Sequence, residues 1–171
     1  IEERHGSGPA SYSGRVTLPA HLRLSPGEAL VAVGANLGDR RGTIDRGLAA
    51  IAALEATTVL AVSRWHETAP VGPAQPDYLN GVVRIATGLG PHTLLDALLG
   101  IERGLGRVRD AETRWGPRTL DLDLIAFGDL MFEDDRLTLP HPRADDRLFV
   151  LEPLADLLDP DSVAGRSLAM R

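Results

Sequence analysis

The segment Leu120-Asp121-Leu122-Asp123-Leu124 alternates apolar and acidic side chains at every position. Successive side chains of a β-strand point to opposite faces of the sheet, so the alternation predicts a strand whose leucines are turned into a core. Asp121 and Asp123 then share the other face of a half-buried strand, which we expect to run over residues 120–127.

Outward from this strand, the expected elements follow a βαββαβ order, because short apolar runs predict strands and helical spacing predicts helices. In chain order we expect a strand over 29–34, a helix capped by Asp39 that runs to about residue 54, strands over 57–67 and 78–87, a helix from Pro91 to about residue 105, and the strand over 120–127. An acidic hairpin over 128–136, a short strand over 137–139 and a last helix over about 144–158 follow. This order predicts an α+β fold, a ferredoxin-like sandwich with helices packed on one face of an antiparallel sheet, plus an extra hairpin and a C-terminal helix.

The length of 171 residues suits one folded domain. Residues 1–28 are rich in Gly, Ser and Pro and show little periodicity, so we expect a flexible extension or linker there and the domain over 29–171. No apolar run reaches the roughly 18 to 20 residues that span a bilayer, which argues against a membrane partner. The formal net charge of −6 argues against general nucleic-acid binding.

The composition also limits the available chemistry. There is no Cys, which excludes disulfides, thiolate nucleophiles and Cys-based metal sites, and which fits a cytoplasmic protein. All 18 basic residues are Arg. Without Lys, neither a P-loop nor Schiff-base chemistry is available. Guanidinium groups and metal ions must therefore handle any phosphate that this protein binds.

The acidic pair lies next to an Arg-rich stretch of sequence. Two carboxylates about 7 Å apart repel each other unless a cation lies between them, and Mg²⁺ is commonly held by one or two carboxylates together with substrate phosphates. Residues 103–118 hold Asp110 and Glu112 against five basic residues, namely Arg103, Arg107, Arg109, Arg114 and Arg118. A positive, glycine-rich loop beside a carboxylate pair suits phosphoryl transfer, in which positioning and charge neutralisation dominate. The alternative is a solvated strand face beside a loop of surface salt bridges.

Aromatic and imidazole side chains are weaker candidates for the site. Trp115, inside the Arg-rich loop, could cover a flat ligand as a lid. Tyr78 and Asn80 share one face of the strand over 78–87, where a ring and an amide suit a planar heterocycle, although half-buried Tyr residues are also common in ordinary packing. His141 stands between two prolines and could bind a phosphate or transfer a proton, or could be purely structural.

Taken together, these stretches resemble a known family, the 6-hydroxymethyl-7,8-dihydropterin pyrophosphokinases of folate biosynthesis. The resemblance extends from about Leu30 to Asp159. The stretches that carry it are 33–40 (VGANLGDR), 76–80 (PDYLN), 106–109 (GRVR), 114–123 (RWGPRTLDLD) and 139–142 (LPHP). The fourth stretch is highly specific, and the five occur in the family's order. The resemblance implies the transfer of pyrophosphate from ATP to the hydroxymethyl group of the pterin, with release of AMP.

The resemblance also implies a role for each matching residue. The expected catalytic residues are Arg107, Arg118, Asp121 and Asp123, and the two aspartates would bind two Mg²⁺ ions. The expected ATP site consists of Glu102, Arg107, Arg109, Arg114, Trp115, Arg118, Leu124, Thr138, His141 and Arg147. The expected pterin site consists of Thr68, Pro70, Val71, Gly72, Tyr78, Asn80, Trp115, Asp121 and Phe149. In that site Tyr78 and Phe149 would sandwich the ring, and main-chain groups of residues 68–72 would line the pocket.

Two other hypotheses remain open at this stage. One is a non-catalytic regulatory module with the same fold that binds a small ligand, which would leave the Asp pair beside five Arg unexplained. The other is that the chain is the pyrophosphokinase part of a longer folate enzyme, with residues 1–28 as linker. For the enzyme itself we expect ATP and a reduced pterin as partners, a monomer, and a cytoplasmic location.

Overall fold

The computed structural model describes residues 23–70, 73–107, 116–144 and 147–157. In chain order its elements are strand β1 (Glu28–Ala35), helix α1 (Arg40–Ala52), strands β2 (Thr57–Val62), β3 (His66–Thr68) and β4 (Tyr78–Thr87), helix α2 (Pro91–Gly104), strands β5 (Asp121–Phe127), β6 (Phe132–Glu133) and β7 (Thr138–Leu139), and helix α3 (Leu148–Asp156). Within this described part, no helix has the length and apolarity that a membrane span requires. Of the expected extension over 1–28, residues 1–22 lie outside the described residues.

The main sheet is antiparallel and joins β2, β4, β1 and β5 in that order, with β3 also paired to β4. Helix α1 connects β1 to β2 across β4, and α2 connects β4 to β5 across β1. This split arrangement of strands and helices is that of a ferredoxin-like sandwich, so the predicted fold class is confirmed. Strands β6 and β7 pair as the expected extra hairpin.

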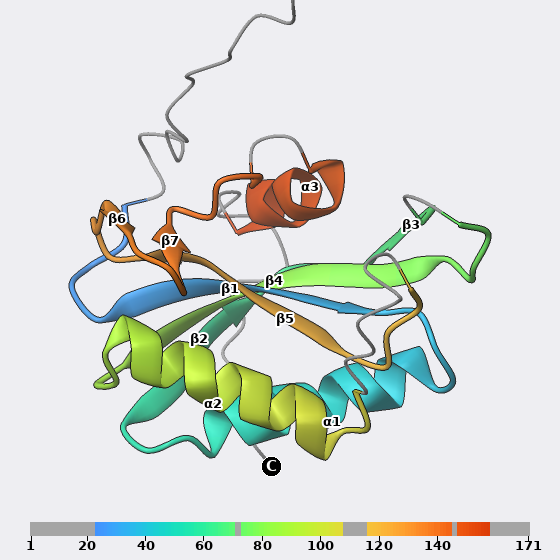
Figure 1. The fold of residues 1–171 in the computed structure, drawn as a ribbon, viewed down its shortest axis with the longest axis horizontal. Helices are drawn as coiled ribbons and strands as arrows, with labels where there is room; N and C mark the ends of the chain where they lie inside the picture. The colour runs from blue at the N-terminus through green and yellow to red at the C-terminus, as the bar shows by residue number, and fades with distance from the viewer. Residues whose placement is uncertain (1–22, 71–72, 108–115, 145–146, 158–171) are drawn as a thin grey trace, which may run out of the picture.

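Alternation along β1 divides its side chains between two apolar cores. Val31 and Val33 pack with residues of α1 and α2, whereas Leu30 and Ala32 pack with residues of α3. Figure 1 shows the same division, with α1 and α2 on one face of the sheet and α3 on the other. The sheet is therefore covered on both faces, and α3 covers the face that carries Asp121 and Asp123.

The strand expected over 57–67 is interrupted, and it forms β2 and β3 instead. At the break, the main-chain N–H of Val82 donates to the hydroxyl of Ser63 (2.9 Å) in place of a main-chain carbonyl of the neighbouring strand. The Trp65 ring lies against Gly81, where a Cβ atom would come within 2.5 Å of the ring. The regular main-chain hydrogen bonding between the two strands therefore stops at Ser63. The expectation of one continuous strand over 57–67 is wrong.

The last helix begins at Leu148 rather than near residue 144. Ala144 is buried in a turn, in which its N–H donates to the carbonyl of His141 (3.0 Å). The first helical hydrogen bonds run to the carbonyl of Arg147, from the N–H groups of Val150 and Leu151. This later start places Arg147 and Phe149 at the N-terminal end of α3, above the sheet.

Candidate active site

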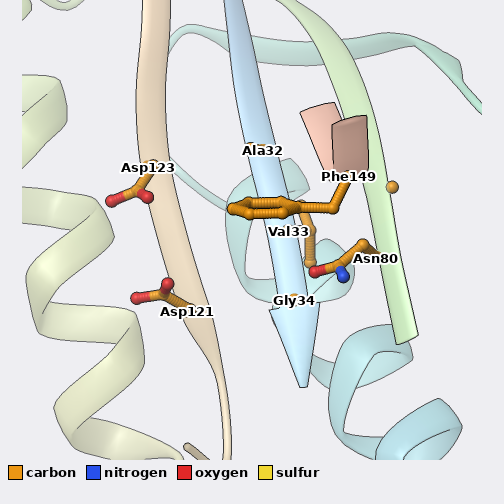
Figure 2. A pocket seen from close by; sticks show the side chains of 8 residues that line it. Ala32, Val33, Gly34, Asn80, Asp121, Asp123 and Phe149 are labelled. Carbon is orange, nitrogen blue, oxygen red and sulfur yellow. The ribbon is translucent and has the colours of Figure 1, made fainter. Parts of the chain in front are cut away.

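Three neighbouring strands bring the polar residues of the site into one row. In the antiparallel register, Gly34 of β1 lies between Asn80 of β4 and Asp121 of β5. Two residues earlier on β1, Ala32 is the register partner of Asp123 on β5. These residues line a pocket together with Val33, Gly81 and Phe149. Figure 2 shows the Phe149 ring lying across β1, with Asn80 on one side and the carboxylates of β5 on the other.

Gly34 keeps the middle of this row open. A Cβ atom at this position would come within 2.5 Å of the Asn80 Oδ1 atom. Asn80 is buried, and its Nδ2 group donates to the Thr68 hydroxyl at 2.6 Å. The amide oxygen of Asn80 is therefore turned toward Gly34, where it can accept a hydrogen bond from a ligand.

The Asp121 carboxylate is held by two guanidinium groups. Its Oδ1 atom accepts from Arg118 Nη1 at 2.6 Å and from Arg107 Nη1 at 2.7 Å. Arg107 also pairs with Glu102, whose buried carboxylate accepts the main-chain N–H of Leu122 at 2.7 Å. Glu102 therefore fixes Arg107 against the start of β5.

Asp123 occupies a different environment from Asp121. Its Oδ2 atom accepts from Arg147 Nη1 at 3.3 Å, and the Arg147 guanidinium also lies 5.3 Å from the centroid of the Phe149 ring. Burial, followed by the charge of Asp121, raises the pKa of Asp123 above its ordinary value. A cation beside both carboxylates would remove this penalty.

His141 lies close enough to this pair to interact with it electrostatically. Its main-chain N–H donates to the carbonyl of Ile125 at 2.8 Å, which fixes the turn against β5. Burial lowers the pKa of the His141 imidazole, and the Asp123 charge opposes that shift without reversing it. A neutral imidazole at physiological pH retains one N–H donor and one acceptor nitrogen.

The donor set of the carboxylate pair suits Mg²⁺. Within the described residues, Asp121 Oδ2 and Asp123 Oδ1 take no hydrogen bond, so each carboxylate keeps one oxygen free for a ligand. The same part of the chain contains no cluster of three or more His, Asp or Glu that could bind a metal without help. Mg²⁺ is the ion that proteins typically hold through one or two carboxylates while substrate phosphates and water supply the other ligands.

The aromatic residues expected from the sequence lie near Gly34 and Asn80. Tyr78 begins β4 and is half-buried, and burial raises the pKa of its hydroxyl. Its ring comes within 3.7 Å of the position that a Cβ atom on Gly34 would take. Tyr78 and Phe149 thus both lie near Gly34, and a flat heterocycle could stack on these rings.

Other residues predicted for the site have more varied positions. Leu124 is buried on the opposite side of β5, in the core that faces α1 and α2, so its side chain is turned away from the pocket. Thr138 lies in the hairpin strand β7, and Pro70 follows β3. The predicted site residues that lie outside the described residues are Val71, Gly72, Arg109, Arg114 and Trp115.

Ala32, Gly34 and Asn36 are not among the residues predicted for the site. Ala32 and Gly34 line the pocket, and Asn36 is a buried polar residue immediately beyond β1. A signal was present, because Gly34 and Asn36 fall within the first of the five stretches that carry the family resemblance. Small and amide residues at the end of a strand have no chemistry that singles them out without a structure.

Comparison with known proteins shows the family to which this chain belongs. Residues 30–159 match the family model described as 7,8-dihydro-6-hydroxymethylpterin-pyrophosphokinase. A 2-amino-4-hydroxy-6-hydroxymethyldihydropteridine pyrophosphokinase of Synechocystis sp. is 45% identical over 139 residues, which cover 81% of this chain and 70% of that protein. The enzyme of the same name from Pseudomonas aeruginosa is 49% identical over 128 residues, covering 74% and 78%. The mitochondrial folate synthesis bifunctional protein of Arabidopsis thaliana is 43% identical over 142 residues, covering 80% of this chain and 25% of that longer protein. This chain therefore belongs to the 7,8-dihydro-6-hydroxymethylpterin-pyrophosphokinase family.

Proposed function

We propose that this chain transfers pyrophosphate from ATP to the hydroxymethyl group of 6-hydroxymethyl-7,8-dihydropterin and releases AMP, as a step of folate biosynthesis. One observation carries the proposal. The carboxylates of Asp121 and Asp123, flanked by Arg side chains, share a sheet face with Asn80 and line one pocket with Asn80 and with Phe149 of α3. A cluster of carboxylates and guanidinium groups thus meets an amide and an aromatic ring across β1, and the family description names the pterin and the pyrophosphoryl transfer. We assign the phosphates of ATP to the first group of residues and the pterin to the second.

On the phosphate side, Arg107 and Arg118 would bind the phosphate oxygens. Burial alone would lower the pKa of Arg118, but the adjacent Asp121 carboxylate outweighs this effect and raises it, so the guanidinium stays charged. We assign Asp121 and Asp123 as ligands of two Mg²⁺ ions, which would neutralise the phosphate charge and align the reacting groups. His141 and Arg147, both beside Asp123, would assist in holding the same phosphates.

On the pterin side, Tyr78 and Phe149 would stack on the two faces of the ring. Asn80 would accept a hydrogen bond from a ring N–H or amino group through the Oδ1 atom that faces Gly34. Main-chain groups of Thr68 and Pro70 would line the edge of the pocket. Together these contacts would hold the hydroxymethyl group toward the carboxylates of β5, in a position for attack.

The reaction is a direct displacement. The hydroxymethyl oxygen forms a bond to the β-phosphorus of ATP, the bond from that phosphorus to the oxygen of the α-phosphate breaks, and AMP leaves with the electron pair. The hydroxyl proton passes to solvent or to a basic group in the site. A covalent enzyme intermediate is not required, because the sequence offers neither a Cys thiolate nor a Lys amine as nucleophile.

An AMP-release assay tests this proposal. Wild type, Asp121→Ala and Asp129→Ala would be incubated with ATP, Mg²⁺ and the pterin. Asp129 is an exposed carboxylate in the turn after β5 and serves as the matched control. We expect pterin-dependent AMP from wild type and Asp129→Ala, and almost none from Asp121→Ala. Binding of Mn²⁺, followed by electron paramagnetic resonance, should weaken in Asp121→Ala alone, which tests the metal site independently of turnover.

The opposite result would favour a binding module. If the folded wild type bound the pterin but released no AMP above background, the enzyme assignment would be wrong for this chain.

We also propose that the protein is monomeric, that it acts in the cytoplasm without nucleic-acid or membrane partners, and that it forms part of a longer folate-pathway polypeptide. The third proposal is supported by relatives such as the Arabidopsis bifunctional protein, of which the matching region is a quarter. Light scattering of the purified protein tests the first proposal, and cell fractionation tests the second. The mass of the native polypeptide on an immunoblot tests the third.

A further inference from the structure

Asn36 is a buried amide whose contacts reach both halves of the pocket. It follows the last residue of β1, and 2% of its surface is exposed. Its Nδ2 group donates to the Gln75 Oε1 atom at 2.9 Å and to the carbonyl of Pro76 at 3.0 Å. Its Oδ1 atom accepts the main-chain N–H of Arg118 at 2.7 Å, and its own main-chain N–H donates to the carbonyl of Arg118 at 3.1 Å.

These partners determine the orientation of the amide. A main-chain carbonyl can only accept and a main-chain N–H can only donate, so Nδ2 must face Pro76 and Oδ1 must face Arg118. A flipped amide would place two donors together on one side and two acceptors on the other. Asn36 is therefore a specific bridge between two chain segments that are 40 and 82 residues distant from it in sequence.

Each bridged segment continues directly into one half of the site. Pro76 precedes Tyr78, the aromatic residue at the start of β4, by two residues. Arg118 carries the guanidinium that binds Asp121. Arg40, four residues after Asn36, strengthens the first attachment, because its Nη1 atom donates to the carbonyl of Asp77 at 2.9 Å.

We propose that Asn36 is a positioning residue that fixes the segment before Tyr78 and the backbone of Arg118 relative to each other, so that the pterin-binding and phosphate-binding halves keep one alignment. This inference rests on the proposed function. Asn36 itself would touch neither the pterin nor the phosphates, and it acts through the positions of Tyr78 and Arg118. Its effect on turnover comes from alignment, to which displacement reactions are sensitive on a scale of about 1 Å.

Steady-state kinetics of Asn36→Ala test the proposal. We expect kcat/KM to fall about 10- to 100-fold for each substrate, since a 1 Å misplacement costs on that order. Thr87→Val is the matched control. Thr87 is also buried, and its hydroxyl also accepts a main-chain N–H and contacts a second side chain, but it lies at the other end of β4. The control should lose a similar amount of stability and keep the wild-type kcat/KM.

A second variant, Gln75→Ala, separates alignment from stability and stays informative if Asn36→Ala does not fold. It removes one of the two acceptors of Asn36 Nδ2 on the segment before Tyr78 and leaves the contacts of Asn36 to Arg118 intact. We therefore expect KM for the pterin to rise several-fold while KM for ATP stays within twofold of wild type.

Two results would overturn the proposal. One is an Asn36→Ala protein that melts at a lower temperature but keeps wild-type kcat/KM, since that would mean a purely structural role. The other is a Gln75→Ala protein whose two KM values change equally or not at all. An inactive wild type would instead contradict the proposed function, so the two failures can be told apart.

Discussion

At the scale of single residues, the site provides its own counterions. Arg107 and Arg118 share one oxygen of Asp121, and Arg147 pairs with Asp123. Without substrates, the guanidinium groups neutralise the carboxylates, as metal cations would do. The carboxylates in turn neutralise the guanidinium groups, as phosphates would do. Because each guanidinium is planar and offers several N–H donors, it can keep one partner while it binds a phosphate.

Arg107→Lys tests whether that geometry matters. Arg107 bridges Glu102 and Asp121, which a Lys ammonium on a flexible stem cannot do with the same precision. We expect kcat to fall about 10- to 100-fold through misalignment, with little change in melting temperature. Steady-state assays and thermal unfolding measure the two effects. The same change at Arg103, which is exposed near the end of α2, should have no effect, and full activity in Arg107→Lys would argue against a bridging role.

A second prediction at this scale concerns the Asn80 amide. Thr68→Val removes the hydroxyl that holds Nδ2, so the amide can rotate and turn its donor toward the pocket. We expect KM for the pterin to rise about three- to tenfold, the worth of one hydrogen bond, and KM for ATP to stay unchanged. Thr68→Ser keeps the hydroxyl and should restore wild-type values. An equal rise in Thr68→Ser would show that the methyl group, rather than the hydroxyl, is what matters.

The sequence predicts some of these residues and not others for a physical reason. Asp121 and Asp123 are predictable because strand periodicity alone places them on one face. The roles of Asn36 and Thr68 depend on partners that only folding brings together, such as Arg118 at 82 residues from Asn36. An amide or a hydroxyl has no local pattern that indicates such a partner.

At the scale of elements, the placement of α3 decides the shape of the pterin side. The helix presents Phe149 at its N-terminal end and is attached at its C-terminal end by Asp156, whose buried carboxylate binds Arg64 and His66. Arg64 lies at the break between β2 and β3, and His66 lies in β3. The interruption of the expected 57–67 strand therefore places both residues where they can bind Asp156 of α3. The strand ends where the Ser63 side chain accepts a hydrogen bond from Val82, and the spacing of apolar residues does not predict such an end.

Asp156→Asn should weaken this attachment. It keeps the size of the side chain but removes the charge, so we expect a loss of about 2 kcal/mol of unfolding free energy at neutral pH, the worth of a hydrogen bond to a charged group. Because Phe149 lies in the same helix, KM for the pterin should rise as well. Urea unfolding and steady-state assays measure both effects. A stability equal to that of wild type at pH 7 would contradict the role of the carboxylate.

The pH dependence of that loss follows from the pKa of Asp156. Burial alone would raise this pKa, but hydrogen bonds from Arg64 and His66 outweigh burial and lower it. A lowered folded-state pKa contributes stability that is complete above the unfolded-state value, about 3.9, and that disappears as the pH falls through the folded-state value. The difference between wild type and Asp156→Asn should therefore shrink below about pH 4. Glu152 lies 3.7 Å from His66 and can also pair with it, so Glu152→Gln serves as the background for the comparison.

At the scale of the whole molecule, the two faces of the sheet have different tasks. The face toward α1 and α2 holds the larger apolar core, including Leu94 and Leu98, and carries none of the pocket's polar groups. The face toward α3 holds a smaller core and the pocket side by side. The βαββαβ order predicts that α1 and α2 cover the first of these faces, because each crossover helix must pack back onto the sheet. It does not predict which face a C-terminal helix covers, since no crossover constrains that choice.

This division predicts different consequences for the same truncation on the two faces. Leu94→Ala and Leu154→Ala each truncate a leucine whose surface is at most 4% exposed, one from each core. We expect both to lower the free energy of unfolding by about 2 to 5 kcal/mol, through lost burial and the cavity left behind. Only Leu154→Ala should also raise KM for the pterin, because the loosened helix carries Phe149. Assays well below both melting temperatures separate the effects, and an equal change in KM for the two variants would mean that stability and substrate binding are not divided between the faces.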